Sequence, residues 1–102
     1  MPQRLTDLHP HWWHMHGDPE GVHRGLNFDC PVHGPTEILS MRFLNPIGTD
    51  EPAPGYRHYW QRTGETFETL TLTPSLDYTK YDNGQPRDPT CWHGFITNGE
   101  VT

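Results

Sequence analysis

Proline and glycine divide this chain into short segments. Its 102 residues include 11 prolines and 10 glycines, and both residue types interrupt regular helices and mark turns. No window shows the sustained 3.6-residue hydrophobic repeat of an amphipathic helix with caps. The spacing of the short segments predicts an all-β fold, a small antiparallel sheet or barrel, with room for one short helix.

Six segments between these breaks are rich enough in apolar and β-forming residues to form strands. They are residues 22–29, 36–44, 56–63, 65–73, 76–81 and a last strand within 92–101 that bends at Asn98 and Gly99. The clearest is 65–73, where leucines and threonines alternate and Pro74 should close the strand. Pro46 should likewise stop the strand at 36–44.

The composition predicts one domain, residues 1–102, with a thin core. Hydrophobic residues make up only 31% of the chain, and the mean hydropathy is -0.85. Small domains with few aliphatic side chains often gain stability from a metal, from disulfides or from a partner subunit. The net charge is -6, and Lys80 is the only lysine. Because nucleic-acid-binding domains carry a basic surface, we expect no nucleic acid as partner.

The ends and the hydropathy of the chain favour a cytoplasmic location. No apolar run follows the first residues, as a secretory signal would require, and no stretch approaches the roughly 20 apolar residues of a membrane span. In a reducing cytosol, two cysteines more often mark a metal site or free thiols than a disulfide.

Two short stretches far apart in sequence carry both cysteines. Cys30 and His33 lie in residues 30–34 (CPVHG), and Cys91 and His93 lie in residues 91–94 (CWHG). Structural zinc takes four ligands of these types in a tetrahedron. One tight turn can aim Cys30 and His33 at one ion, and residues i and i+2 of an extended segment point the same way. We therefore predict one Zn²⁺ held by Cys30, His33, Cys91 and His93, which staples the domain.

Other arrangements of the same residues stay open. Cys30 and Cys91 could form a disulfide, or they could be two buried free thiols with unrelated histidines nearby. A second metal site could form among the N-terminal histidines, although surface imidazoles are the plainer interpretation. These histidines are His9, His11, His14, His16 and His23. The four tryptophans could also form a recognition surface, with core packing as the plainer alternative.

A catalytic zinc site would need an open coordination position and a general base. The candidate bases are Glu37, Glu65, Glu68 and Glu100. Each of them is otherwise expected to be a solvated strand residue. The HExxH motif and the zinc-deaminase signature are both absent from the sequence.

Five segments resemble a domain-of-unknown-function family of small phage and bacterial proteins. They are residues 4–8 (RLTDL), 28–31 (FDCP), 60–64 (WQRTG), 68–75 (ETLTLTPS) and 92–100 (WHGFITNGE). The resemblance spans nearly the whole chain and implies a zinc-binding β domain of phage or prophage origin, some relatives of which are encoded beside bacterial ubiquitin-like conjugation genes. Members of the family often have more cysteines where this chain has His33, so His14 or His16 could replace it as a ligand.

These observations predict a zinc-stabilised, cytoplasmic, phage-type protein that acts by binding another macromolecule, with a protein as the expected partner. An exposed aromatic or acidic surface would make the contact. One alternative is a small zinc-dependent hydrolase with an open metal site and a glutamate base. Another is a virion or assembly component.

Overall fold

The computed structural model confirms the all-β prediction. It describes residues 3–78, 81–82, 85–86 and 91–102. Within these ranges the elements in chain order are β1 (Gln3–Arg4), the 3-10 helix η1 (Leu5–Leu8), β2 (His11–Trp13), β3 (His23–Cys30), β4 (Gly34–Ile47), β5 (Gln61–Thr63), β6 (Thr71–Asp77), β7 (Tyr81–Asp82), β8 (Gln85–Pro86), β9 (His93–Thr97) and β10 (Glu100–Val101). The short helix η1 is the one helical element that the sequence left room for.

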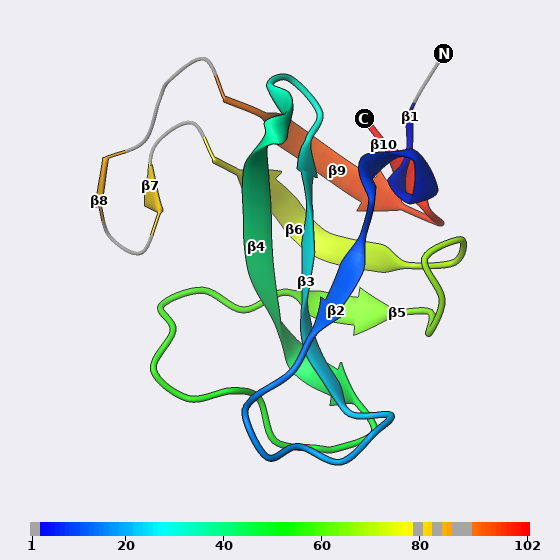
Figure 1. Ribbon diagram of the computed structural model, residues 1–102, viewed down its shortest axis with the longest axis vertical. Helices are drawn as coiled ribbons and strands as arrows, with labels where there is room; N and C mark the ends of the chain where they lie inside the picture. The colour runs from blue at the N-terminus through cyan, green and yellow to red at the C-terminus, as the bar shows by residue number, and fades with distance from the viewer. Residues whose placement is uncertain (1–2, 79–80, 83–84, 87–90) are drawn as a thin grey trace.

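The strands form two antiparallel sheets and a small hairpin. The five-stranded sheet has the order β1-β10-β9-β6-β5, the three-stranded sheet has the order β2-β3-β4, and β7 pairs with β8. Figure 1 shows the three-stranded sheet crossing in front of the five-stranded one. A parallel bridge between Phe43 and Trp60 joins the sheets, with hydrogen bonds from Leu44 N to Trp60 O (2.8 Å) and from Trp60 N to Arg42 O (3.0 Å).

The core lies between the two sheets and follows the two-residue alternation of the strands. In β4, Leu39, Met41 and Phe43 are buried, and the residues between them face solvent or are half-buried. Side chains of β3, β6 and β9 complete this core from both sheets, and they are Leu26, Phe28, Leu72, Leu76 and Ile96. Apolar burial on facing sheets is therefore the main force that holds the layers together.

Two of the predicted strands match well. The strand predicted at 22–29 is β3, and Gly25 lies at the register irregularity that a glycine in a strand suggested. A Cβ atom at Gly25 would lie 2.3 Å from the backbone oxygen of Met41, so only glycine fits there. The last strand bends as predicted, because Asn98 (φ 50°) and Gly99 (φ 77°) form the left-handed turn between β9 and β10.

The prediction for residues 65–73 was wrong in its first half. Residues 65–69 form a turn in which the backbone N–H of Thr69 donates to the carbonyl of Thr66 (3.2 Å) and the two hydroxyls are 2.8 Å apart. Gly64 (φ 83°) starts this turn. Threonine hydroxyls that bond the local backbone compete with strand pairing, and here they win.

Two prolines do not end strands where we expected them to. β4 continues through Pro46 to Ile47, and β6 continues through Pro74 to Asp77. Each proline lies beside a register irregularity of its strand pair, where a missing N–H costs no ladder hydrogen bond. The strand predicted at 56–63 forms only from Gln61 onward.

The segment predicted as a strand at 76–81 is divided between two elements. Leu76 and Asp77 are the end of β6, and Tyr81 begins β7. Residues 79–80 of this prediction lie outside the described residues. No helix within the described residues is long and apolar enough to cross a membrane.

Two leucines of β4, one buried and one exposed, allow a direct test of which side of the strand faces the core. Leu39 is 1% exposed and Leu44 is 49% exposed. We expect Leu39→Ala to lower the free energy of unfolding by about 2–5 kcal/mol, because it removes buried apolar area and leaves a cavity. Leu44→Ala, the same change on the same strand, should stay within about 0.5 kcal/mol. Equal losses in urea unfolding would contradict this assignment of the core.

Candidate metal centre

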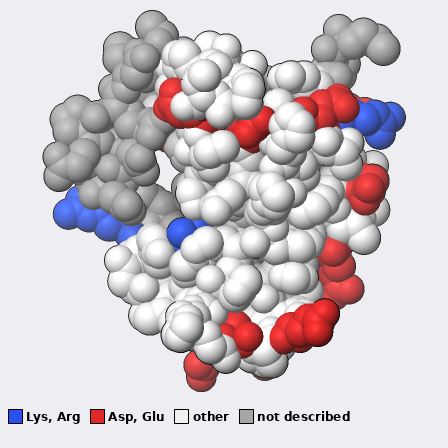
Figure 2. All heavy atoms as spheres, viewed as in Figure 1, with Lys and Arg blue, Asp and Glu red and all other residues white. Residues whose placement is uncertain are grey.

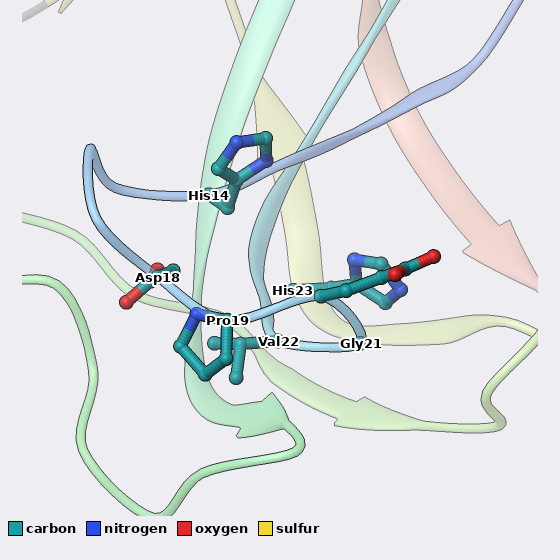
Figure 3. A pocket seen from close by; sticks show the side chains of 7 residues that line it. His14, Asp18, Pro19, Gly21, Val22 and His23 are labelled. Atoms are coloured by element: carbon teal, nitrogen blue, oxygen red, sulfur yellow. The ribbon is translucent and has the colours of Figure 1, made fainter.

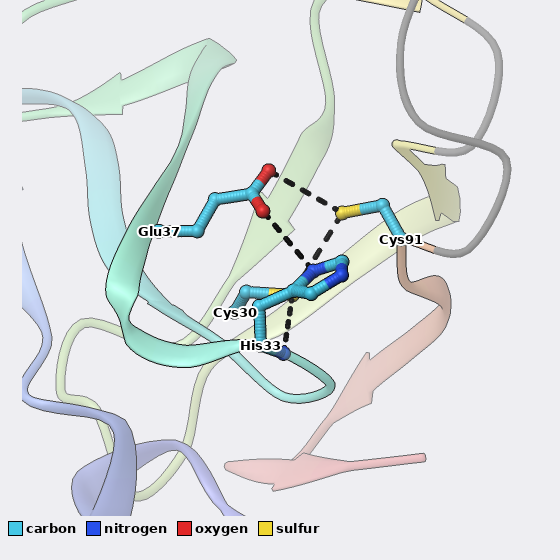
Figure 4. Close-up of side chains that lie close together, drawn as sticks. All are labelled: Cys30, His33, Glu37 and Cys91. Atoms are coloured by element: carbon cyan, nitrogen blue, oxygen red, sulfur yellow. Dashed lines mark hydrogen bonds and ion pairs between the residues drawn. The ribbon is translucent and has the colours of Figure 1, made fainter.

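Four metal-binding side chains converge where the two sheets meet. Cys30 ends β3, His33 lies in the turn that follows, and Glu37 comes from the start of β4. Cys91 comes from the other sheet, two residues before β9. Their donor atoms all lie within 4.8 Å of one another, and Figure 4 shows the four side chains pointing toward a common centre. We call these residues the donor cluster.

The spacing of the donor atoms can be compared with the edges of a tetrahedron around zinc. Metal–ligand distances of about 2.3 Å to sulfur and about 2.0 Å to nitrogen or oxygen give edges of about 3.8 Å between two sulfurs, about 3.5 Å between sulfur and nitrogen or oxygen, and about 3.3 Å between nitrogen and oxygen. The sulfurs of Cys30 and Cys91 are 3.7 Å apart, and Cys30 Sγ lies 3.5 Å from His33 Nδ1.

The carboxylate of Glu37 completes the set. Its Oε1 is 3.7 Å from Cys91 Sγ, and its Oε2 is 3.0 Å from His33 Nδ1. With two sulfurs, one imidazole nitrogen and one carboxylate oxygen, the cluster could hold a metal ion.

The turn after β3 supports the first sulfur. The backbone N–H groups of Val32 (3.4 Å) and His33 (3.3 Å) both donate to Cys30 Sγ. Such bonds stabilise negative charge on sulfur and fix the ligand's orientation, as outer-shell partners of metal sites do. Gly34 (φ 72°) pairs with Cys30 and turns the chain into β4, which brings Glu37 back beside His33.

Burial differs sharply across the donor cluster. Cys30 and Cys91 are 0% and 6% exposed, whereas the side chains of His33 and Glu37 are 28% and 27% exposed. The sulfurs therefore form the inner half of the cluster, and the imidazole and carboxylate form its outer half.

The structure brings together three of the four ligands that the sequence predicted. Cys30, His33 and Cys91 belong to the donor cluster, and His93 does not. His93 is exposed on β9, opposite Asp77, and its Nε2 lies 3.2 Å from the hydroxyl of Ser75. The prediction for His93 assumed an extended chain from residue 91, but β9 begins only at His93 itself.

The member of the donor cluster that the sequence analysis missed is Glu37, which it considered only as a possible base or a solvated strand residue. The alternation of buried and exposed residues along β4 contains a signal for Glu37. Leu39, Met41 and Phe43 face the core, so Glu37 lies at the next position on the same side of the strand. An acidic side chain in line with a buried face needs a partner. The other candidate bases, Glu65, Glu68 and Glu100, are exposed.

Cys30 and Cys91 do not form a disulfide with each other. Their sulfurs are 3.7 Å apart, and a disulfide bond is about 2.05 Å long. The distance between the two sulfurs is instead close to the one expected for two sulfur ligands of a single ion.

The histidine-rich N-terminal region forms a different kind of site. A cavity of about 170 Å³ is lined by residues of the loop between β2 and β3 and by the first residue of β3. These residues, whose side chains are drawn in Figure 3, are His14, Asp18, Pro19, Glu20, Gly21, Val22 and His23. Asp18 accepts hydrogen bonds from Met15 N (2.8 Å) and Arg24 Nε (2.8 Å). The Arg24 hydrogen bond lowers the pKa of Asp18, so this carboxylate closes the loop as part of an ion pair.

The N-terminal histidines do not gather around a common centre. Among the described residues, the donor cluster is the only group of three or more side chains placed to share an ion. His9 lies 2.7 Å from the buried carboxylate of Asp29, and His23 stacks on Trp12. His14 lines the loop cavity, and His33 occupies the ligand position for which His14 and His16 were alternatives.

Comparisons of the chain with protein-family models, with curated proteins and with solved structures found no match. The resemblance to the phage and bacterial family stays a prediction.

His23 makes folding depend on pH. Burial, and then the nearby charge of His14, lowers the pKa of His23 below its usual value of 6.5, and no described residue bonds its buried Nδ1. The unfolded chain therefore binds more protons here, so the contribution of His23 to stability is complete above about pH 6.5 and is lost as the pH falls below it. His23→Phe, which can keep the stack on Trp12, should show a shallower loss of stability between pH 7 and pH 5.5.

The matched control is His16→Gln, because His16 is exposed. Chemical unfolding across this pH range should give the wild-type slope for His16→Gln. If His23→Phe also kept that slope, the half-buried imidazole of His23 would not be the source of the pH dependence.

Proposed function

We propose that the protein is a zinc-stabilised domain that acts by binding another macromolecule. The observation that carries the zinc assignment is the spacing of the donor cluster. The distance between the sulfurs (3.7 Å) and the distance from Cys30 Sγ to His33 Nδ1 (3.5 Å) each lie within about 0.1 Å of a tetrahedral zinc edge.

The donor types also favour zinc. Two thiolates and an imidazole suit a borderline-soft ion, whereas magnesium and calcium prefer oxygen ligands. Four donors in a tetrahedron are the usual structural zinc site. Cys30 ends β3, Cys91 lies two residues before β9 of the other sheet, and the two cysteines are 61 residues apart in sequence. One ion would therefore close a long loop and hold the two layers together.

Removal of zinc tests the structural role. Purified protein should contain about one zinc per chain. When free zinc exceeds its dissociation constant about a thousandfold, binding adds about 4 kcal/mol, so a chelator should lower the melting temperature by roughly 15–30 °C. Cys91→Ser should melt like the chelated wild type. An unchanged melting curve after complete metal removal would refute the structural role.

Two substitutions to glutamine test which residue is the fourth ligand of the metal. Glu37→Gln replaces a carboxylate donor of the cluster by a neutral, weaker amide oxygen, so the dissociation constant of zinc should rise at least about tenfold, since even outer-shell changes cost 10–100-fold. His93→Gln alters a residue that lies against Ser75 and should leave zinc affinity within about threefold of the wild type. Competition with a coloured zinc chelator measures both values. The reverse order would restore His93 as the ligand.

Exposed apolar side chains support the binding role. Ile38 and Leu44 lie on the solvent side of β4 and are 57% and 49% exposed, and Val32 projects from the turn before it. The tryptophans are poorer candidates, because Trp12 is stacked between His23 and Phe67 and Trp92 is buried. Acidic side chains lie around the edges of the face in Figure 2. We therefore propose a protein partner that covers the solvent side of β4.

Matched baits test this surface. The zinc-loaded wild type and the variant Ile38→Asp should have the same zinc content and melting temperature, because Ile38 is exposed. A bacterial lysate should contain a protein that the wild type retains at least about tenfold better than the variant, because a charge would be buried at the contact. If the two baits retain the same proteins, this face of β4 is not the contact.

A zinc-dependent hydrolase is a second candidate, which one observation favours. Glu37, one of the bases considered from the sequence, lies beside the three other donors. With Cys30, His33 and Cys91 as ligands and a water in the fourth position, its carboxylate would be placed to accept a proton. X-ray absorption separates the candidates. Two sulfurs, one nitrogen and one carboxylate oxygen favour the structural role, and a water bound with three protein ligands favours the hydrolase.

A further inference from the structure

We propose that Arg42 receives a carboxylate of the protein partner, so that the segment of the partner that contacts β4 is acidic. This inference rests on the proposed binding role of β4 and names the chemistry that its partner must have. It is carried by the contacts of Arg42 on the side of the three-stranded sheet that faces away from the core, which we call the outer face. On this face β4 presents Ile38, Ser40, Arg42 and Leu44, and β3 presents Gly25 and Asn27.

The guanidinium of Arg42 is held in place by two aromatic rings and by the glycine opposite it. Arg42 pairs with Gly25 in the register of β3 and β4, and its Nη1 would lie only 3.2 Å from a Cβ atom at Gly25. Trp13 pairs with Gly25 from the other side, and Arg42 Cζ lies 3.6 Å from the centre of the Trp13 ring and 4.7 Å from that of the Tyr56 ring. Cation–π contacts of this kind orient the charge without neutralising it. A partner therefore meets a preorganised cation, which lowers the entropy lost on binding.

The hydrogen bonds of Arg42 leave donors unsatisfied. Its Nη1 donates to the Ser40 hydroxyl (2.6 Å) and to the carbonyl of Met41 (3.1 Å). Among the described residues, nothing accepts a hydrogen bond from the buried Nε or from Nη2, and no carboxylate lies within ion-pair distance of the guanidinium. A half-buried guanidinium without a carboxylate has donors to offer to a ligand.

A chain of hydrogen bonds on the outer face ends in a second donor. Because a guanidinium can only donate, the Ser40 hydroxyl accepts from Arg42 and gives its own proton to Asn27 Oδ1 (2.6 Å). This bond determines the orientation of the Asn27 amide and leaves its Nδ2 as a donor with no hydrogen bond to the described residues. Arg42 and Asn27 thus present N–H groups on neighbouring strands, and a ligand that satisfies both must supply acceptors.

A carboxylate fits these donors better than a phosphate does. Arg24, the other arginine of the three strands, is already paired with Asp18 (2.8 Å), so Arg42 is the guanidinium left for a ligand. One guanidinium balances the single charge of a carboxylate, whereas a phosphate group carries nearly two charges. A carboxylate also offers two acceptor oxygens for charge-assisted hydrogen bonds. The acidic side chain that β3 itself presents here, Asp29, lies 2.7 Å from His9 Nδ1.

Apolar side chains flank Arg42 along the strand. Ile38 and Leu44 are 57% and 49% exposed, so a segment laid along β4 would cover both and exclude water from the ion pair between them, which strengthens it. In Figure 2 most of the surface of this side is uncharged, with acidic side chains toward its rim. The net charge of -6 opposes an acidic partner at long range, but salt screens charges more than about 8 Å apart. We therefore expect an acidic residue flanked by apolar ones.

Selection from a library of random nine-residue peptides tests this chemistry. The purified wild-type protein should enrich peptides in which an aspartate or glutamate lies between apolar residues. An enriched peptide, made with an amidated C-terminus so that only its side chain offers a carboxylate, should bind at least about tenfold more tightly than the same peptide with the acid replaced by its amide, because a charged hydrogen-bonded pair is lost. Fluorescence polarisation measures both dissociation constants, and this comparison needs no variant of the protein.

Two substitutions to methionine provide matched controls. Arg42→Met keeps an unbranched side chain that can pack against Trp13 and Tyr56 but removes the charge, so it should bind the acidic peptide at least about tenfold more weakly and should no longer distinguish it from its amide. A merely structural role of Arg42 would leave that discrimination in place. Arg4→Met makes the same change at an exposed arginine of the other sheet and should keep the wild-type affinity within about twofold.

The outcomes separate this inference from the binding role on which it rests. Enriched peptides that have no acidic residue and do not bind Ile38→Asp would support the partner surface on β4 and overturn the carboxylate receptor. Acidic peptides that bind Arg42→Met as tightly as the wild type would also overturn it. A library from which the wild type enriches no peptide would overturn both the receptor and the binding surface.

Discussion

The contact between Cys30 and Cys91 is the constraint on which the donor cluster depends. The sulfurs lie 3.7 Å apart. Cys30 ends β3, and Cys91 lies two residues before β9, a strand of the other sheet. A few ångströms away, a carboxylate and an imidazole face the same centre. Without a cation, ionised thiols and a carboxylate at this spacing would repel one another. A divalent ion at this centre would replace that repulsion by an attraction between the layers, which is the structural role that we propose for zinc.

The strand β4 relates this centre to the rest of the fold. Near its start it carries Glu37, and further along it carries Phe43, whose bridge to Trp60 is the backbone connection between the sheets. Between these two points, Leu39 and Met41 are buried. The two sheets are therefore joined at two places along one strand, by backbone hydrogen bonds at one and by the donor cluster at the other. Between these two places the Tyr78 hydroxyl donates to the carbonyl of Ser40 (2.9 Å), and buried apolar side chains pack around it.

Local patterns in the sequence predicted those parts of the molecule that depend on neighbouring residues. The all-β class, the strand at β3 and the bend at Asn98 and Gly99 follow from alternation and turn chemistry. The errors lie where pairing with a distant strand decides the outcome. Pro46 remains within a strand because the pairing of β4 with β3 is irregular beside it. In the same way, two threonine hydroxyls close a turn where alternation favoured a strand.

The same distinction between local spacing and distant packing applies to the members of the donor cluster. Cys30 and His33 lie on one turn, and their spacing in sequence was enough to pair them. Cys91 could be joined to them because it was the only other cysteine.

His93 illustrates what spacing alone cannot decide. The i, i+2 argument requires an extended chain through Trp92, but the Trp92 ring packs into the core against Phe28 (5.9 Å between ring centroids) and Tyr78 (6.3 Å). The chain then enters β9 with His93 on the exposed side. Cys91 and Trp92 are both buried and His93 is exposed, so the chain is not extended at residues 91–93 and the two predicted ligands do not share a side.

The fourth member of the donor cluster is Glu37, on the inward face of β4. A carboxylate oxygen is a harder donor than sulfur or an imidazole nitrogen, so it differs from the histidine that the sequence predicted. The turn of the chain that directs His93 to solvent thus leaves a cluster of unequal members. The two sulfurs are buried, and the imidazole and the carboxylate form the part of the cluster that solvent reaches. An ion bound here would have sulfur on its core side and nitrogen and oxygen on its solvent side.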